Sequence, residues 1–137
     1  MSTTPIKDIK KALETRLLSI SPTIPTGFEG VDFNPPKEMY QFCQVVIRPP
    51  TDPVFGKGYY KENVQFQIFV SIPQGKGTGE ALGRAELIRN TFQKGTTILE
   101  GGVQISVLET PHVGSSSIIA NRVMVPIFVN VIGEVLV

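Results

Sequence analysis

The sequence predicts an α+β fold: a single, mainly antiparallel, twisted sheet of four to five strands with two helices packed on one face. Two observations lead to this prediction. Residues 63–92 read as a strand, a glycine turn and a helix, and residues 5–20 read as a second helix. The other apolar stretches alternate every second residue, as strands with one buried face do. Such a face needs a covering layer, which the helices can supply.

The first helix is predicted to begin at Thr4 and Pro5. Thr4 offers a side-chain oxygen as a cap, and proline suits the first helical turn. An apolar stripe at helical spacing indicates that the helix lies on the sheet; it comprises Ile6, Ile9, Leu13, Leu17 and Ile20. Three lysines on the other faces (Lys7, Lys10 and Lys11) are either a solvated surface or a contact for an acidic partner, and the near-neutral chain favours the solvated surface.

Two strands and a long arm are expected next. Phe28, Val31 and Phe33 indicate a short first strand, and Tyr40 to Arg48 a second one that is apolar on both faces. Residues 49–58 then carry three prolines and two glycines, which predicts an extended arm between antiparallel strands. Long loops tend to be functional. We therefore expect this arm to contact a partner, through Asp52, Phe55 and Lys57.

The central unit runs from Asn63 to Phe92. Its strand alternates Val64, Phe66, Ile68, Val70 and Ile72 with Gln65, Gln67, Phe69 and Ser71, and Pro73 ends it. Three glycines then form a turn at residues 75–79. In the helix that follows, a stripe of Ala81, Leu82, Ala85, Ile88 and Phe92 is predicted to face the core, with Glu80, Arg84 and Arg89 away from it.

The C-terminal third adds strands and a second loop. Thr96 to Leu99 is a short extended piece, Val103 to Leu108 a strand, and Thr110 to Ser117 a flexible loop in which His112 and Ser115 are candidate contacts. Pro126 indicates that the last strand, Val123 to Ile132, is an edge strand or is bulged. Its alternation places Met124 and Phe128 opposite the core, together with Phe69 if the strands share a sheet. Apolar side chains on such a face predict a subunit interface.

Composition narrows the function. The 137 residues are expected to form one domain, 1–137. The net charge of +1 gives no indication of binding to nucleic acid or to a membrane surface. Charged residues make up only 18% of the chain, against the usual quarter, which suggests contact with other protein. Cys43 is the only cysteine, so an internal disulfide and a structural zinc site are excluded, and we interpret it as a small core residue in a reducing cytosol. No signal peptide is expected, and the apolar tract 123–137 is too short and too interrupted to span a membrane.

Catalytic patterns are weak. The Gly75–Gly79 turn misses both the Walker A and the dinucleotide-binding spacings, so a simple turn with Thr78 or Gly79 at the helix cap is favoured over a nucleotide site. His112 is the only histidine, and the nearby Ser115 to Ser117 run has no nucleophile elbow. Glu29, Asp32 and Glu38 lie near the first strand, but no pattern indicates that any two of them form a catalytic pair of carboxylates. We expect no enzyme activity, catalytic residue, cofactor or metal; the alternative is a small nucleotide- or ligand-binding enzyme that uses the glycine turn.

Several segments resemble the tail terminator (tail completion) proteins of long-tailed bacteriophages, related to the lambda-type minor tail protein. They are the strand Phe66 to Val70 entering Pro73-Gln74-Gly75-Lys76-Gly77, the helix Ala81 to Phe92, the exit Ile47-Arg48-Pro49-Pro50 and the strand Val123 to Ile127. The resemblance implies a hexameric ring that caps the tail tube, stops its polymerisation and offers a surface to the head. The implied partners are further copies, the tail tube protein and a head completion or connector protein, with no membrane and no sequence-specific nucleic acid.

The resemblance also implies a location: the host cytoplasm during assembly and then the tail of the virion, encoded by a phage or a prophage. Within this interpretation we assign the subunit interface to Phe69, Met124 and Phe128. Another ring protein of the phage neck or tail tube remains an alternative.

Overall fold

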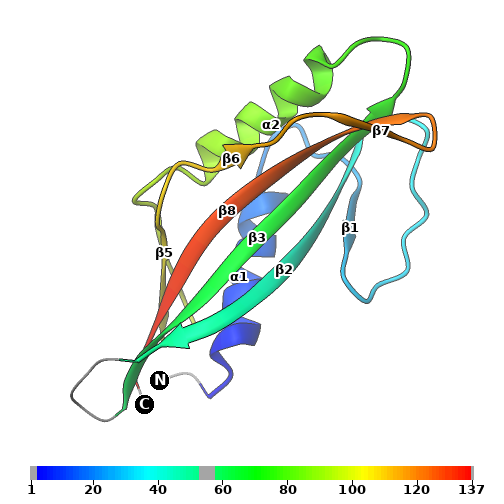
Figure 1. Cartoon of the computed structure of the whole chain (residues 1–137). Coiled ribbons are helices and arrows are strands. Elements are labelled where there is room, and N and C mark those ends of the chain that lie inside the picture. The colour runs from blue at the N-terminus through cyan, green and yellow to red at the C-terminus, as the bar shows by residue number, and fades with distance from the viewer. Residues whose placement is uncertain (1–2, 53–57, 137) are drawn as a thin grey trace.

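The computed structural model describes residues 3–52 and 58–136, which contain two helices and one curled sheet (Figure 1). The helices are α1 (Pro5–Leu18) and α2 (Gly79–Thr91). The strands are β1 (Thr26–Phe28), β2 (Tyr40–Thr51), β3 (Tyr59–Pro73), β4 (Thr97–Glu100), β5 (Val103–Val107), β6 (His112–Val113), β7 (Ser117–Ile119) and β8 (Arg122–Leu136).

The sheet is organised around three long strands that run side by side (Figure 1). Its order is β1-β2-β3-β8-β5-β4, and β6 and β7 also pair with β8. β3 and β8 pair without a break from Tyr59 opposite Leu136 to Pro73 opposite Arg122. β1 runs parallel to β2, whereas the other pairs are antiparallel.

The prediction of four to five strands in a mainly antiparallel sheet is therefore wrong, because the sheet has eight strands and is mixed. β1, β4, β6 and β7 contain only two to four residues each, too few for an alternating pattern to be recognised. β6 and the first residue of β7 fall in the predicted flexible loop Thr110 to Ser117. The first strand ends at Phe28, so Val31 and Phe33 lie beyond it.

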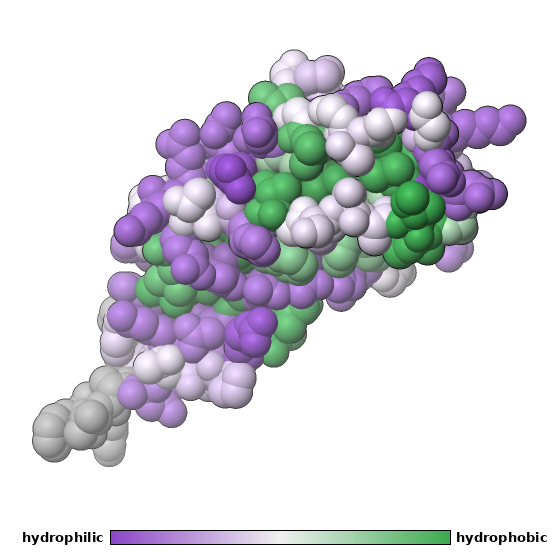
Figure 2. Space-filling model, turned by 45° about the horizontal axis from the view of Figure 1, so that its top comes forward, coloured by the Kyte–Doolittle hydropathy of each residue, from purple (hydrophilic) through white to green (hydrophobic). Residues whose placement is uncertain are grey.

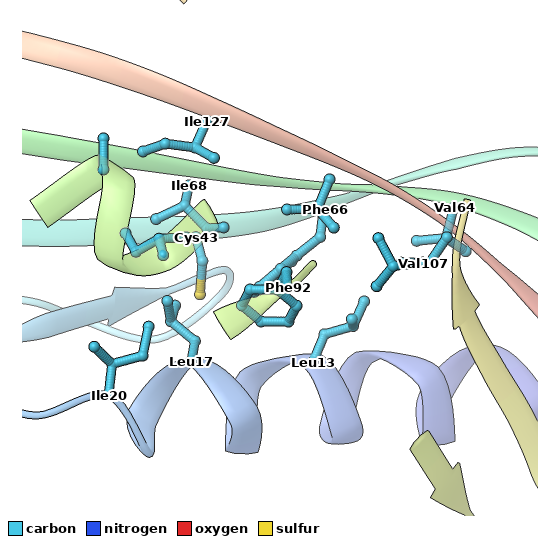
Figure 3. Packing of buried hydrophobic residues seen from close by; sticks show 14 of the residues in the cluster. Leu13, Leu17, Ile20, Cys43, Val64, Phe66, Ile68, Phe92, Val107 and Ile127 are labelled. Atoms are coloured by element: carbon cyan, nitrogen blue, oxygen red, sulfur yellow. The ribbon is translucent and has the colours of Figure 1, made fainter. Parts of the chain in front are cut away.

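One core fills the space between the helices and the inner face of the sheet, the face on which Phe66 lies (Figure 3). α1 contributes Ile9, Leu13 and Leu17, as its stripe predicts. The rings of Phe66 and Phe92 meet edge to face, with their centroids 5.8 Å apart. Burying each of these large side chains contributes about 1.5–3 kcal/mol, so this layer holds both helices on the same face.

α2 faces the core with Ala81, Ala85 and Ile88, as predicted, but two of its other residues differ from the prediction. Arg84 is buried, with only 3% of its surface exposed, while Leu82 is exposed. The Arg84 guanidinium donates a hydrogen bond to the Pro22 carbonyl oxygen, and its Nε has no hydrogen-bond partner among the residues that the structure describes. Burial therefore lowers the pKa of Arg84, because desolvation disfavours the charged form. Hydrophobicity alone placed these two residues on the wrong sides of the helix.

β8 is not an edge strand, although it contains Pro126. β3 pairs with it on one side, and β5, β6 and β7 pair with it on the other. The carbonyl oxygen of Pro126 accepts a hydrogen bond from the Gly114 N–H at 2.8 Å, between the pairs made by β6 and β7. The nitrogen and the oxygen of one strand residue point to the same side of the strand. The missing N–H of Pro126 is therefore on the side of β6 and β7, between the residues that pair with them, and no hydrogen bond to β3 is lost.

Cys43 lies in the core, as predicted. It is fully buried, and its Sγ lies 3.7 Å from the Gly27 carbonyl oxygen. Burial raises the pKa of the Cys43 thiol to about 12, with a smaller contribution from the Glu14 carboxylate. Cys43 therefore stays a neutral thiol at physiological pH and packs as a small apolar group.

Candidate assembly surface

The candidate functional surface is the face of β2, β3 and β8 that lies opposite the helices, which we call the open face. The strand register places Phe42 beside Phe69, and Phe69 beside Pro126. Met124 stands opposite Ser71, and Phe128 opposite Gln67, on the same face. The three predicted interface residues, Phe69, Met124 and Phe128, thus lie on one surface, and each is half-buried. Whether this surface meets another subunit stays a prediction.

An apolar groove occupies one end of the open face. It has a volume of about 470 Å³ and lies between the strands and the segment that follows β1. The residues that line it are Val31, Asp32, Phe33, Pro35, Tyr40, Phe42, Phe69 and Met124. Asp32 is the one lining residue that carries a charge, and Phe33 and Tyr40 place their ring centroids 5.6 Å apart. The groove offers aromatic and aliphatic surface with little to hold a polar ligand.

Arg122 fixes the segment beside this groove. Its Nε donates to Ser71 Oγ at 2.7 Å, and its two Nη atoms donate to the carbonyl oxygens of Lys37 at 2.8 Å and Glu38 at 2.7 Å. The guanidinium also lies 4.7 Å from the centre of the Tyr40 ring. A planar group with several donors suits this task, because one side chain can hold two backbone carbonyls and an aromatic face at once.

A row of amides crosses the open face beside the groove. Gln44 donates to Gln67 at 2.6 Å, Gln67 to Gln65 at 2.7 Å, and Gln65 to Asn130 at 3.1 Å. The row ends where Asn130 donates to the Glu109 carboxylate at 2.6 Å. These bonds hold the side chains of three strands in one arrangement, so the groove is bordered by an ordered polar surface.

The predicted loop contacts lie at two places. His112 is in β6, where its ring stacks on Phe128 with a centroid separation of 6.0 Å and an interplanar angle of 15°. Ser115 is exposed in the connection between β6 and β7. Asp52 is exposed directly after β2, whereas Phe55 and Lys57 lie outside the described residues. The structure therefore brings His112 together with Phe128 and separates both from Asp52.

The glycine turn lies beside two acidic side chains, Glu38 and Glu80. Gly75 and Gly77 adopt positive φ angles of 113° and 76°, which explains the need for glycine there. Lys76 lines a cavity of only about 120 Å³ together with Glu38 and Glu80, and two carboxylates beside a helix N-terminus repel a phosphate. Across residues 3–52 and 58–136, no group of three or more His, Cys, Asp or Glu side chains could hold a metal ion. Neither described helix is long and apolar enough to cross a membrane.

Sequence reasoning missed Tyr40, Phe42 and Arg122 as parts of this surface. Tyr40 and Phe42 alternate with the buried Gln41 and Cys43, so the period of two that assigned Phe69 to the open face could have assigned them as well. Arg122 gave no local signal, because its partners lie more than fifty residues away in the sequence.

Comparison with known proteins identifies the family. A model of the phage tail terminator protein family matches residues 8–130. A solved structure with 22% sequence identity covers 100% of this chain, and the chain covers 97% of it, with a TM-score of 0.73; at this identity the match shows a shared fold. No curated protein sequence matches the chain. The chain belongs to the phage tail terminator protein family and is a structural component of the phage tail.

Proposed function

We propose that the protein assembles into a closed, hexameric ring on the end of the tail tube, stops tube polymerisation there and presents the surface that joins the tail to the head. The open face carries this proposal. Its groove exposes aromatic and aliphatic side chains on the one face of the sheet that no helix covers. Removing such surface from water stabilises an assembly by about 25 cal/mol per Å².

A ring requires one contact between two different surfaces of the same chain, repeated until it closes. We assign Phe69, Met124 and Phe128 to one side of this contact. All three are half-buried in the monomer and point away from the core. The stacking of His112 on Phe128 supports this assignment, because it holds the Phe128 ring in place before any partner arrives.

The contacts with the tube and the head are assigned to the two connections on which the candidate residues lie. Asp52 directly follows the last residue of β2. His112 and Ser115 belong to the β6–β7 region beside β8. Contacts made after β2 and beside β8 would allow one ring to meet two partners, which supports a joining role.

The test is a tube-length assay. Tail tube protein is polymerised with and without this protein, and tube lengths are measured by negative-stain electron microscopy. We expect the wild-type protein to cap the tubes and shorten them, and Phe128→Asp to lose this effect, since a buried unpaired carboxylate opposes assembly. Leu99→Asp is the matched control, because Leu99 is exposed on β4, away from the groove, and should retain capping. Equal tube lengths with and without the wild-type protein would refute the proposed function.

A further inference from the structure

The two halves of α2 are held to the rest of the molecule by different means. We infer that residues 75–87, the glycine turn and the N-terminal half of α2, form a flap that opens from the inner face of the sheet while residues 88–92 stay in the core. The hinge lies at Gly75, because the N–H of Gln74 is still held by the Asn121 carbonyl oxygen at 3.1 Å. Since α2 packs on β3 and β8, the open flap uncovers apolar side chains of these strands. This inference concerns the single chain and does not depend on the proposed ring.

The C-terminal end of α2 is anchored by large side chains and by two arginines. Ile88 and Phe92 are fully buried, and the Phe92 ring lies in the core (Figure 3). The Thr91 carbonyl oxygen accepts a hydrogen bond from Arg16 Nε of α1 at 2.8 Å. Arg89 Nε donates at 3.2 Å to the backbone carbonyl oxygen just before β6. These contacts hold this end of the helix to the core, to α1 and to the chain before β6.

The flap has no large apolar side chain that is fully buried. Its buried apolar residues are Ala81 and Ala85, whereas Leu82 and Leu87 are 39% and 41% exposed. Figure 2, which brings the upper side of Figure 1 and with it α2 toward the viewer, shows hydrophobic surface among hydrophilic side chains. The free energy of burial scales with the apolar area removed from water. Two alanines therefore hold the flap less tightly than an isoleucine and a phenylalanine hold the anchored end.

Arg84 is the third buried side chain of the flap. Its guanidinium donates a hydrogen bond to the Pro22 carbonyl oxygen, in the connection between α1 and β1. Its Nε has no acceptor in the described part of the chain, and a buried polar group without a partner opposes burial. The closed position of the flap thus depends on one arginine hydrogen bond and on two small side chains.

The backbone of the flap is poorly suited to form a helix on its own. Gly75 and Gly77 adopt positive φ angles of 113° and 76°, and Gly83 lies inside the helix. Thr78, at the N-cap, makes no side-chain hydrogen bond that caps the helix. Glycine is unfavourable inside a helix, and a helix this short is marginal in water. The flap therefore unravels when it leaves the sheet.

Thiol labelling of the native protein tests the opening. Ala81→Cys places a thiol under the flap, and Ala12→Cys is the matched control under α1, where the alanine is also buried. The fully buried native Cys43 reports unfolding of the whole chain. At a concentration where the protein is monomeric, we expect a thiol reagent to label position 81 roughly tenfold or more faster than position 12 or Cys43. Equal rates at the three positions would show that α2 leaves the sheet only when the whole chain unfolds, and would overturn the inference.

Gly83→Ala separates the opening of the flap from any effect of the new thiol. A Cβ at this position meets nothing within 4 Å, so the change raises helix propensity without adding a contact. In the Ala81→Cys background it should slow labelling by roughly two- to fivefold. Asn90→Ala also favours the helix, but in the anchored end, and should leave the rate unchanged. Equal slowing by both variants, or no slowing by Gly83→Ala, would contradict a flap that opens on its own.

Two arginine variants test what keeps the flap closed. Arg84→Ala removes the hydrogen bond to Pro22 and should speed labelling at position 81 by roughly tenfold. Arg89→Ala removes a hydrogen bond from the anchored end of the same helix and should leave that rate unchanged. Slow labelling of Cys43 in each variant confirms that the chain is folded. If Arg84→Ala leaves the rate unchanged, or if both variants raise it equally, Arg84 does not hold the flap and the inference fails.

Discussion

Phe66 and Phe69 are three residues apart in β3 and lie on opposite faces of the sheet. Phe66 is fully buried against Phe92, whereas Phe69 is half-buried on the open face. We expect Phe66→Ala to lower the free energy of unfolding by about 3–5 kcal/mol, because it leaves a cavity in the core. Phe69→Ala should cost about 1 kcal/mol or less in the monomer. Urea unfolding at a concentration where both variants are monomeric measures the difference, and equal losses would contradict the assignment of faces.

Cys43 gives a second test at the scale of a single residue. Its pKa is raised from 9.0 to about 12 in the folded protein. Between these values the unfolded chain loses the thiol proton while the folded chain keeps it, so unfolding releases a proton and stability falls as pH rises. Below about pH 9 both the folded and the unfolded chain keep the thiol proton, so Cys43 causes no loss of stability there. Urea unfolding at pH 8 and pH 10.5 should show a larger loss for the wild-type protein than for Cys43→Ala, and identical losses would exclude this role.

At the scale of elements, pattern length separates what the sequence could predict from what it could not. The helix α1 and the strands β3 and β8 contain fourteen or fifteen residues each, and their type was predicted correctly. β3 begins four residues before the predicted start at Asn63, and β8 ends four residues after the predicted end at Ile132. β1, β6 and β7 form only because β2 and β8 offer unpaired edges beside them, and such long-range pairing leaves no local pattern. The prediction of an edge strand from Pro126 was wrong for the same reason. Which neighbouring strand its nitrogen faces depends on tertiary structure, which the local sequence does not show.

Arg122 is the residue through which β8 positions a neighbouring element. Arg122→Lys keeps the charge but cannot reach Ser71 and both carbonyls of residues 37 and 38 together. We expect it to cost about 1–3 kcal/mol and to speed hydrogen exchange of the amides of residues 37–41. Exchange followed by mass spectrometry makes the comparison, with Arg48→Lys, exposed near the other end of the long strands, as the control. Unchanged exchange in this segment would show that Arg122 does not hold it.

For the whole molecule, the open face was predictable in outline and its groove was not. The period of two places Phe69, Met124 and Phe128 on a common face once β3 and β8 are neighbours. The groove depends on the segment after β1 lying beside these strands, where Phe33 meets Tyr40. The inward turn of Arg84 follows from a contact with Pro22, distant in sequence. Both features come from tertiary packing that no local pattern encodes.

Sedimentation velocity over a range of concentrations tests the central claim, the ring, most directly. We predict a species of about six times the 15.0 kDa mass of the chain, which grows with concentration, and a folded monomer for Phe128→Asp. Circular dichroism of the variant confirms that the monomer is folded. Rings that persist in Phe128→Asp would show that this residue is not in the contact. A wild-type chain that stays monomeric at every concentration, with and without tail tubes, would contradict the ring itself.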